Sequence, residues 1–294
     1  MATQSITSAT SATTAQHRPH PNRLVGSAAT YIILAVLAIL WVIPLLWALD
    51  TALKHESETT LVPISWFAPS GFTLNAFIET LSSSDLPRWY FNSLLTSAVI
   101  TILTVLFASL AGFAFSRIPF RSKGFFFWLI LAGIMVPGQI LIVPLFTMMQ
   151  SLGMVNTYWG IILPQLASPV AMFIFKQYFD GIPQELEDAA VMDGASRLRI
   201  YWQIWMPLAK PAIAAVAIFT FVWSWNNFIW PFLVITGTNM MTVPVGLATV
   251  QTSYGIRYAQ IMATAILGGL PLLIIFIFFQ RQIVQGFVGT GLKG

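Results

Sequence analysis

The stretch QELEDAAVMDGASRLRIYWQIWMPLAKPA, residues 184–212, separates two long apolar runs and carries charges that those runs lack. The wider segment from residue 176 to residue 210 holds nine charged residues: Lys176, Asp180, Glu185, Glu187, Asp188, Asp193, Arg197, Arg199 and Lys210. Moving all of them to the centre of a bilayer would cost on the order of 25 kcal/mol, at about 3 kcal/mol each. We therefore expect this segment to form a loop outside the membrane that joins two transmembrane spans.

The composition of the whole chain is that of a membrane protein. Hydrophobic residues make up 57% of the 294 residues, charged residues make up 8%, and the mean hydropathy is +0.78. The absence of cysteine excludes disulfides and thiolate metal sites, and we predict no bound metal. The net charge of +4 comes from basic residues scattered between apolar runs. We attribute this charge to membrane topology, with lipid and not nucleic acid as a partner.

Six apolar runs are long enough to cross a bilayer, which requires about 20 helical residues. They contain no Asp, Glu, Lys or Arg and cover residues 27–49, 91–116, 124–148, 158–175, 211–235 and 259–280. We predict an all-α polytopic membrane protein with six transmembrane helices. The membrane domain then covers residues 27–280, with the charged loop at 177–210. A Ser/Thr-rich N-terminal tail, 1–26, is expected to be disordered, and a short tail, 281–294, follows the last span.

The distribution of Lys and Arg orients these spans, because cytoplasmic segments are enriched in both residues. If both termini are cytoplasmic, that side holds Arg18, Arg23, Arg117, Arg121, Lys123, Lys176, Arg197, Arg199, Lys210, Arg281 and Lys293. The other side keeps Lys54, Arg88 and Arg257. We therefore place the charged loop and both termini in the cytoplasm. On the outer side, Lys54 and Arg257 are candidates for contact with an acidic soluble protein.

Within the loop, the sequence predicts a helix, a break and a second helix. The carboxylates of Glu185, Glu187 and Asp188 suit a first helical turn, and Gly194 suits a left-handed helix end. A second helix is expected from about Ser196, where Asp193 could accept hydrogen bonds from free N–H groups. Its residues Leu198, Tyr201, Trp202 and Trp205 are spaced to form one apolar stripe. Because the first helix is acidic, it is better suited to contact a protein than anionic lipid.

These residues resemble the cytoplasmic EAA loop of bacterial ABC importer permeases. The positions that match its pattern are Pro183, Glu185, Leu186, Asp188, Ala189, Ala190, Asp193, Gly194, Ala195, Ile204, Pro207 and Pro211. Asp188 stands where the family usually has Glu, and Met206 where Leu is usual. The segment FVWSWNNFIWPF, 221–232, and the C-terminal VQGFVGTGLKG are also similar to the six-span, maltose-transporter type of carbohydrate permease.

The resemblance implies a subunit of the bacterial cytoplasmic membrane that works with several partners. In that family the loop helix inserts into a cytoplasmic ATPase dimer, a second permease completes the pathway, and an extracytoplasmic protein delivers substrate. The resemblance assigns ATPase coupling to Glu185, Leu186, Asp188, Ala189, Ala190, Asp193, Gly194 and Ala195. It also implies that the C-terminal tail contacts the ATPase dimer through Gly291, Lys293 and Gly294. ATP and Mg would be bound by the partner ATPase, because this chain has no phosphate-binding loop and no bound cofactor is expected. The chain itself would be a transport subunit and not an enzyme.

The candidate substrate residues are Trp223, Trp225, Asn226 and Asn227, which combine flat apolar faces with amide groups and suit sugar rings. The same tryptophans fit an interfacial aromatic belt, and Gln165 fits a helix-to-helix hydrogen bond. We expect a di- or oligosaccharide as substrate. A glycerol-phosphate-type substrate is the main alternative, although the spans contain no cation to bind a phosphate. A sodium-coupled carrier is a second alternative, but it would leave the acidic loop unexplained.

Overall fold

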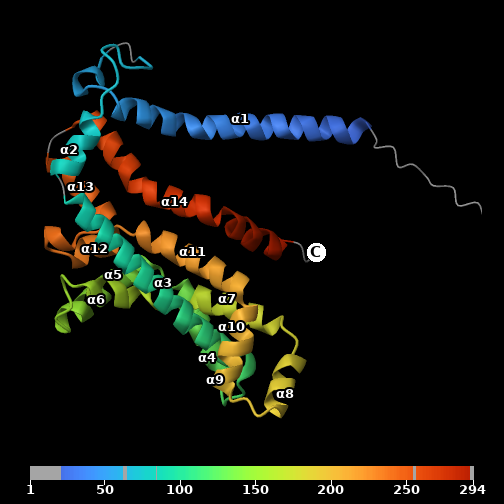
Figure 1. The fold of residues 1–294 in the computed structure, drawn as a ribbon. Helices are drawn as coiled ribbons and strands as arrows, with labels where there is room; N and C mark the ends of the chain where they lie inside the picture. Colours follow the sequence, from blue (N-terminus) through green and yellow to red (C-terminus); the bar gives the residue numbers. More distant parts are fainter. Residues whose placement is uncertain (1–20, 62–64, 84, 254–255, 292–294) are drawn as a thin grey trace, which may run out of the picture. The chain divides into compact units, whose positions relative to one another are not determined.

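The structure, a computed structural model, describes residues 21–61, 65–83, 85–253 and 256–291, and within these ranges it is helical without any strand. The chain separates into two compact units, Met1–Ala48 and Leu49–Gly294. The α-helices drawn in Figure 1 are α1 (Pro21–Ala52), α2 (Asn75–Ser83), α3 (Leu86–Arg117), α4 (Lys123–Ala132), α5 (Gly138–Ser151), α6 (Tyr158–Ile162), α7 (Pro169–Asp180), α8 (Glu185–Met192), α9 (Arg197–Ile200), α10 (Met206–Leu208), α11 (Lys210–Trp225), α12 (Ile229–Val234), α13 (Val243–Ser253) and α14 (Tyr258–Gly291). Shorter turns are η1 (Glu56–Glu58), η2 (Gly133–Met135), η3 (Leu163–Gln165), the π-helical η4 (Tyr201–Trp205) and η5 (Thr238–Met240).

Among the described residues, three helices are long and apolar enough to cross a membrane without a break. They are Ala29–Ala52 within α1, Leu86–Arg117, which is α3, and Tyr258–Gln280 within α14. Their positions agree with the first, second and sixth expected spans. Helix α1 begins at Pro21, ahead of the expected start of its span at residue 27.

The other three expected spans are interrupted, which the sequence analysis did not predict. Each corresponds to helices joined at a break, with bends of 102° between α4 and α5 and 49° between α6 and α7. The third bend, 78°, lies between Arg197–Leu208 and α11, and a further break at Asn226 separates α11 from α12. If each bent pair counts as one span, the described residues supply six spans.

Proline explains the position of the sharpest bend. Pro137 has no N–H and disfavours helical geometry at the residue before it, and Val136 is indeed extended with φ −82° and ψ 115°. At the next break, Pro169 occupies the first turn of α7 and the Ser168 hydroxyl accepts a hydrogen bond from the Ala171 N–H.

Helix α3 packs against both α7 and α11 and forms the centre of the second unit (Figure 1). Its buried face is rich in small and hydroxyl-bearing residues: Ser93, Thr96, Ser97, Thr104, Ala108, Ser109 and Gly112. Such residues allow helix backbones to approach closely in a membrane. At Gly112 the two helices approach closely: an added Cβ would lie 2.7 Å from the Cβ of Phe175 on α7.

Candidate functional site

The charged loop folds as a helix, a glycine turn and a second helical segment, as the sequence predicts. Helix α8 carries its three carboxylates in the first turns, and Gly194 ends it with φ +76° in the left-handed region. The second segment starts at α9, but its cap is Ser196 and not Asp193. The Ser196 hydroxyl accepts a hydrogen bond of 3.4 Å from the Arg199 N–H.

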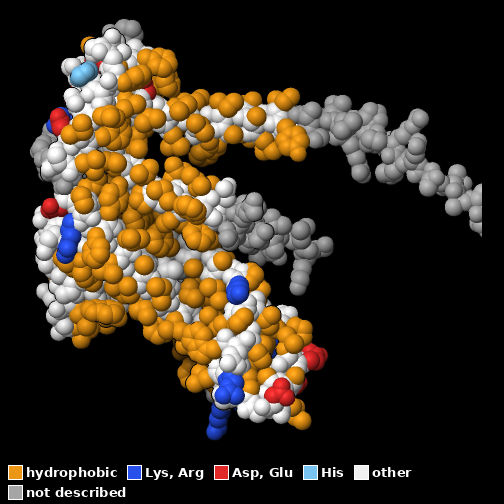
Figure 2. All heavy atoms as spheres, in the orientation of Figure 1, with side chains coloured by type: hydrophobic (Ala, Val, Ile, Leu, Met, Phe, Trp, Pro, Cys, Tyr) orange, Lys and Arg blue, Asp and Glu red, His pale blue; other side chains and the backbone are white. Residues whose placement is uncertain are grey.

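Helix α8 offers an acidic and partly apolar surface that the other described residues leave largely exposed. None of its residues is buried, and the side chains of Val191 and Met192 are 55% and 87% exposed. Among the predicted coupling residues, Glu185, Leu186, Asp188, Ala189, Asp193 and Gly194 are exposed, and Ala190 and Ala195 are half-buried. In Figure 2 acidic side chains gather over this part of the molecule. The surface therefore combines negative charge, small residues and exposed apolar side chains on one short helix.

The second part of the loop, the return segment Arg197–Leu208, packs against the membrane domain. The residues that it buries differ from the predicted apolar stripe. The segment from Tyr201 to Trp205 forms a π-helical turn, and both of these rings are fully buried. Leu198 and Trp202 are instead 66% and 53% exposed, so the prediction of a single stripe of four is wrong. The Tyr201 hydroxyl lies 2.7 Å from the hydroxyl of Ser109 on α3.

A cavity of about 620 Å³ lies where the interrupted spans meet. Its lining comes from α3, α5, the α6–α7 break, α11 and the α11–α12 break: Ile100, Thr104, Gly138, Leu141, Ile142, Leu145, Pro164, Gln165, Ala167, Ser168, Val170, Phe219, Thr220, Trp223, Ser224, Asn227 and Trp230. None of these described lining residues is charged. The volume is in the range of sites that hold small molecules, and the lining is mostly apolar with a few polar groups.

Two amides on the cavity wall hold each other in place. The Asn227 amide nitrogen donates a hydrogen bond of 2.8 Å to the amide oxygen of Gln165. The Gln165 nitrogen donates in turn to the carbonyl of Ile161, also at 2.8 Å. Thr104, on α3, also lines the cavity. Its buried hydroxyl has no hydrogen-bond partner among the described residues.

The structure divides the four candidate substrate residues. Trp223 and Asn227 line the cavity, with Trp223 77% exposed. Trp225 is buried and stacks on Phe221, so it belongs to the hydrophobic core. Asn226 is exposed and donates its hydrogen bond to the carbonyl of Val222 within the same helix. The sequence analysis did not single out Thr104, because it is one of several Ser and Thr residues in the same apolar run. It assigned Gln165 only a hydrogen bond between helices.

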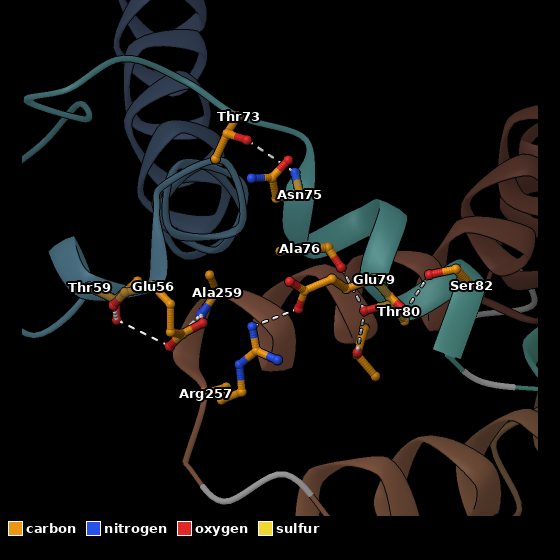
Figure 3. Close-up of polar contacts among 11 residues, drawn as sticks. Glu56, Thr59, Thr73, Asn75, Ala76, Glu79, Thr80, Ser82, Arg257 and Ala259 are labelled. Carbon is orange, nitrogen blue, oxygen red and sulfur yellow. Dashed lines mark hydrogen bonds and ion pairs between the residues drawn. The ribbon is translucent and has the colours of Figure 1, made fainter.

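The cations expected to face a soluble partner are engaged within the chain. Lys54 is buried and pairs with Asp50 at 2.5 Å. Arg257 pairs with Glu79 at 2.6 Å and joins α2 to the segment before α14 (Figure 3). Beside it, the Glu56 carboxylate accepts hydrogen bonds from the Ala259 N–H at the start of α14 (Figure 3). These contacts stabilise the fold on that side and engage both Lys54 and Arg257 within the chain.

The C-terminal tail continues helix α14 as far as Gly291, and the last three residues lie outside the described range. Gly291 is the last residue of α14, while Lys293 and Gly294 lie beyond the described range. Among the described residues, no group of three or more His, Cys, Asp or Glu could hold a metal ion.

Comparison with known proteins identifies the family. Residues 104–288, more than half of the chain, match the family described as "Binding-protein-dependent transport system inner membrane component". The chain is 40% identical over 262 residues to the arabinooligosaccharides transport system permease protein AraQ of Halalkalibacterium halodurans, covering 88% of this chain and 94% of the relative. It is 33% identical over 264 residues to the trehalose/maltose transport system permease protein MalG of Thermococcus litoralis, covering 88% of this chain and 94% of the relative.

The fold is also that of a solved transporter. A crystal structure of a bacterial ABC transporter involved in the import of the acidic polysaccharide alginate contains a chain that superposes with a TM-score of 0.79. That match has 19% sequence identity and covers 89% of this chain and 98% of the other. The chain therefore belongs to the binding-protein-dependent transport system inner membrane components, and it is a multi-pass inner-membrane permease subunit of an ABC importer.

Proposed function

We propose that this permease lines part of the pathway for a neutral di- or oligosaccharide, through the cavity between its interrupted spans. The observation that carries the proposal is the uncharged cavity with its fixed amide pair. Sugars present hydroxyl groups that both donate and accept hydrogen bonds, and their rings have apolar faces that stack on aromatic side chains. Trp223 supplies such a face beside Asn227.

The names of similar proteins support the same substrate class. The two relatives described above are named for arabinooligosaccharides and for trehalose and maltose. A further relative, 31% identical over 260 residues, is the lactose transport system permease protein LacG of Rhizobium radiobacter. A glycerol-phosphate-type substrate is the less favoured alternative, because no described residue of the cavity lining offers a positive charge to a phosphate.

We further propose that α8 transmits the work of ATP hydrolysis from a cytoplasmic ATPase dimer. In this proposal the exposed acidic helix docks in a cleft of the ATPase, and the spans attached to the loop move with it. A second permease subunit and an extracytoplasmic binding protein complete the system. The solved alginate transporter has also been crystallised in complex with a pentasaccharide-bound periplasmic protein, which supports this composition. The C-terminal residues Gly291, Lys293 and Gly294 are proposed to contact the same ATPase dimer.

Uptake of labelled sugars into vesicles that contain the complete transporter tests the substrate. We expect saturable, ATP-dependent uptake of a neutral oligosaccharide, and the variant Asn227→Leu should raise the half-saturating concentration. Glycerol phosphate serves as the competing substrate in the same vesicles. Preferential uptake of glycerol phosphate, or uptake of sugar without ATP hydrolysis, would contradict the proposal.

Crosslinking tests the docking of α8. A cysteine placed at Ala190 should crosslink to the ATPase, with a yield that changes when nucleotide is bound. Gly194→Arg should abolish the crosslink and the uptake, because a side chain at φ +76° is strained and a bulky one blocks close approach. Gly181→Arg is the matched control, since Gly181 has φ −79° at the end of α7. Normal ATPase association and uptake in Gly194→Arg would disprove docking through α8.

A further inference from the structure

Arg117, the last residue of α3, contacts the charged loop at its departure and at its return. Its Nη2 donates hydrogen bonds of 2.5 Å to the carbonyl of Phe179 and 2.6 Å to the carbonyl of Ile182. Phe179 lies in the last turn of α7, and Ile182 lies in the turn that leads to α8. The guanidinium carbon also lies 4.3 Å from the centre of the Trp205 ring in the return segment. One side chain therefore connects three parts of the loop to α3.

The chemistry of these contacts suits an arginine specifically. Carbonyls at the end of a helix lack intrahelical partners, and the helix dipole there favours a cation. A guanidinium can donate in its plane to carbonyls while its flat face stacks on an aromatic ring, whereas an ammonium has no flat face to stack. Trp205 is fully buried, so the stacked ring has little freedom to move. The buried Trp205 ring therefore holds the face of the guanidinium in place, and the two hydrogen bonds to carbonyls fix its orientation.

Further contacts join the end of α3 to the end of α7 and the start of α4. Asp180, at the end of α7, accepts hydrogen bonds from the Ser116 hydroxyl at 2.6 Å and from Lys176 at 2.5 Å. Lys123, at the start of α4, donates to the carbonyl of Ser116 at 3.2 Å. The ends of α3 and α7 are thus joined by charged groups immediately before α8 begins.

Helix α3 also carries the buried hydroxyl of the cavity. Arg117 and Thr104 lie on this one unbroken helix, separated by about 20 Å at 1.5 Å per residue. A displacement applied at Arg117 can therefore reach the cavity wall through a single rigid element, without passing through a break in a span.

We propose that Arg117 is a positioning residue that ties the α8 segment to α3 and so transmits movement of α8 to the cavity. The proposal rests on the proposed docking of α8 to an ATPase. It predicts a specific defect when Arg117 is replaced: ATP hydrolysis continues while less substrate is moved. A residue needed only for folding would lower both activities together.

The test uses the complete transporter, with uptake and ATP hydrolysis measured in the same vesicles. We expect Arg117→Gln to lower the amount of sugar moved per ATP hydrolysed by at least about tenfold, while a cysteine at Ala190 still crosslinks to the ATPase. Arg117→Lys should give an intermediate ratio. Arg121→Gln is the matched control, because Arg121 is exposed in the next loop, and it should behave as wild type.

Trp205 provides the second arm of the test. Trp205→Phe keeps a ring for stacking and should retain most of the coupling, whereas Trp205→Ala should lower the ratio as Arg117→Gln does. A wild-type ratio in Arg117→Gln would overturn the proposal. If that variant does not assemble, a wild-type ratio in both Arg117→Lys and Trp205→Ala would overturn it instead. Failure of the Ala190 crosslink in the otherwise unchanged protein would refute the docking of α8, which is a separate result.

Discussion

Asn227 and Gln165, from the breaks of two different spans, are joined by a hydrogen bond of 2.8 Å between their side-chain amides. Each amide keeps further hydrogen-bonding capacity toward the cavity that both residues line. Because the pair is already ordered, a sugar hydroxyl that binds there does not have to immobilise either side chain. This relationship gives the first of four predictions.

Replacing Asn227 with Ala should weaken substrate recognition more than assembly. The change removes a fixed amide and leaves Gln165 without its partner, at a cost of about 1–2 kcal/mol, or about a tenfold rise in the half-saturating concentration. Sugar uptake into vesicles at graded substrate concentrations measures it. Asn226→Ala is the control, since Asn226 is exposed and outside the cavity lining. A larger effect from Asn226→Ala would show that the cavity is not the recognition site.

Gly112→Ala should destabilise the membrane domain, because the new Cβ would lie 2.7 Å from the Phe175 Cβ and 2.9 Å from the Lys176 nitrogen. Forcing α3 away from α7 should lower the free energy of unfolding by about 1–3 kcal/mol. Denaturation of the purified protein in detergent, followed by tryptophan fluorescence, gives the value. Gly124→Ala, in α4, has no atom within 4 Å of the new Cβ and should be neutral or stabilising. Equal stabilities of the two variants would contradict this account of the helix contact.

The two ion pairs near α2 and η1 should differ greatly in importance. Lys54 and Asp50 are 4% and 9% exposed, and Lys54 also donates to the carbonyl of Ser65 at 2.6 Å. Lys54→Met leaves the Asp50 carboxylate buried without its cation and should cost about 3–5 kcal/mol. In the partly exposed pair, Glu79→Gln should cost less than about 1 kcal/mol, because solvent screens Glu79 and Arg257. Thermal unfolding in detergent at two salt concentrations distinguishes them; similar losses would show that burial does not separate the two pairs.

The hydroxyls of Tyr201 and Ser109 should show an energetic coupling that a double-mutant cycle can measure. They lie 2.7 Å apart in the core under the loop. Tyr201→Phe and Ser109→Ala should each lower the free energy of unfolding by about 1 kcal/mol, and the double variant should lose less than the sum. Additive losses would mean that the two hydroxyls do not stabilise each other. Thr101→Ala on α3 is a control outside this pair, since its hydroxyl bonds to the carbonyl of Ser97.

The breaks in the spans could not be placed from apolar length alone. Pro137 and Pro169 do mark two of them, but Pro44 and Pro271 lie inside helices that continue through them. A proline interrupts a helix only where neighbouring groups satisfy the freed backbone in another geometry, and those neighbours come from distant parts of the chain. Similarly, the apolar spacing of the return segment did not show that Tyr201 and Trp205 are buried while Leu198 and Trp202 stay exposed. Tyr201 and Trp205 are buried because they pack against α3 and α7.

The sequence by itself determined the membrane class, the order of apolar runs and the form of the acidic loop, because these depend on composition, charge cost and local helix signals. Gly194 ends α8 where local chemistry requires a left-handed residue, and Ser196 starts the next segment. Only the tertiary structure decided that Thr104, Gln165 and Asn227 share one cavity and that Arg117 reaches both ends of the loop. Those relationships are contacts between residues far apart in the chain. They are fixed by how α3 packs among interrupted helices, which no local pattern encodes.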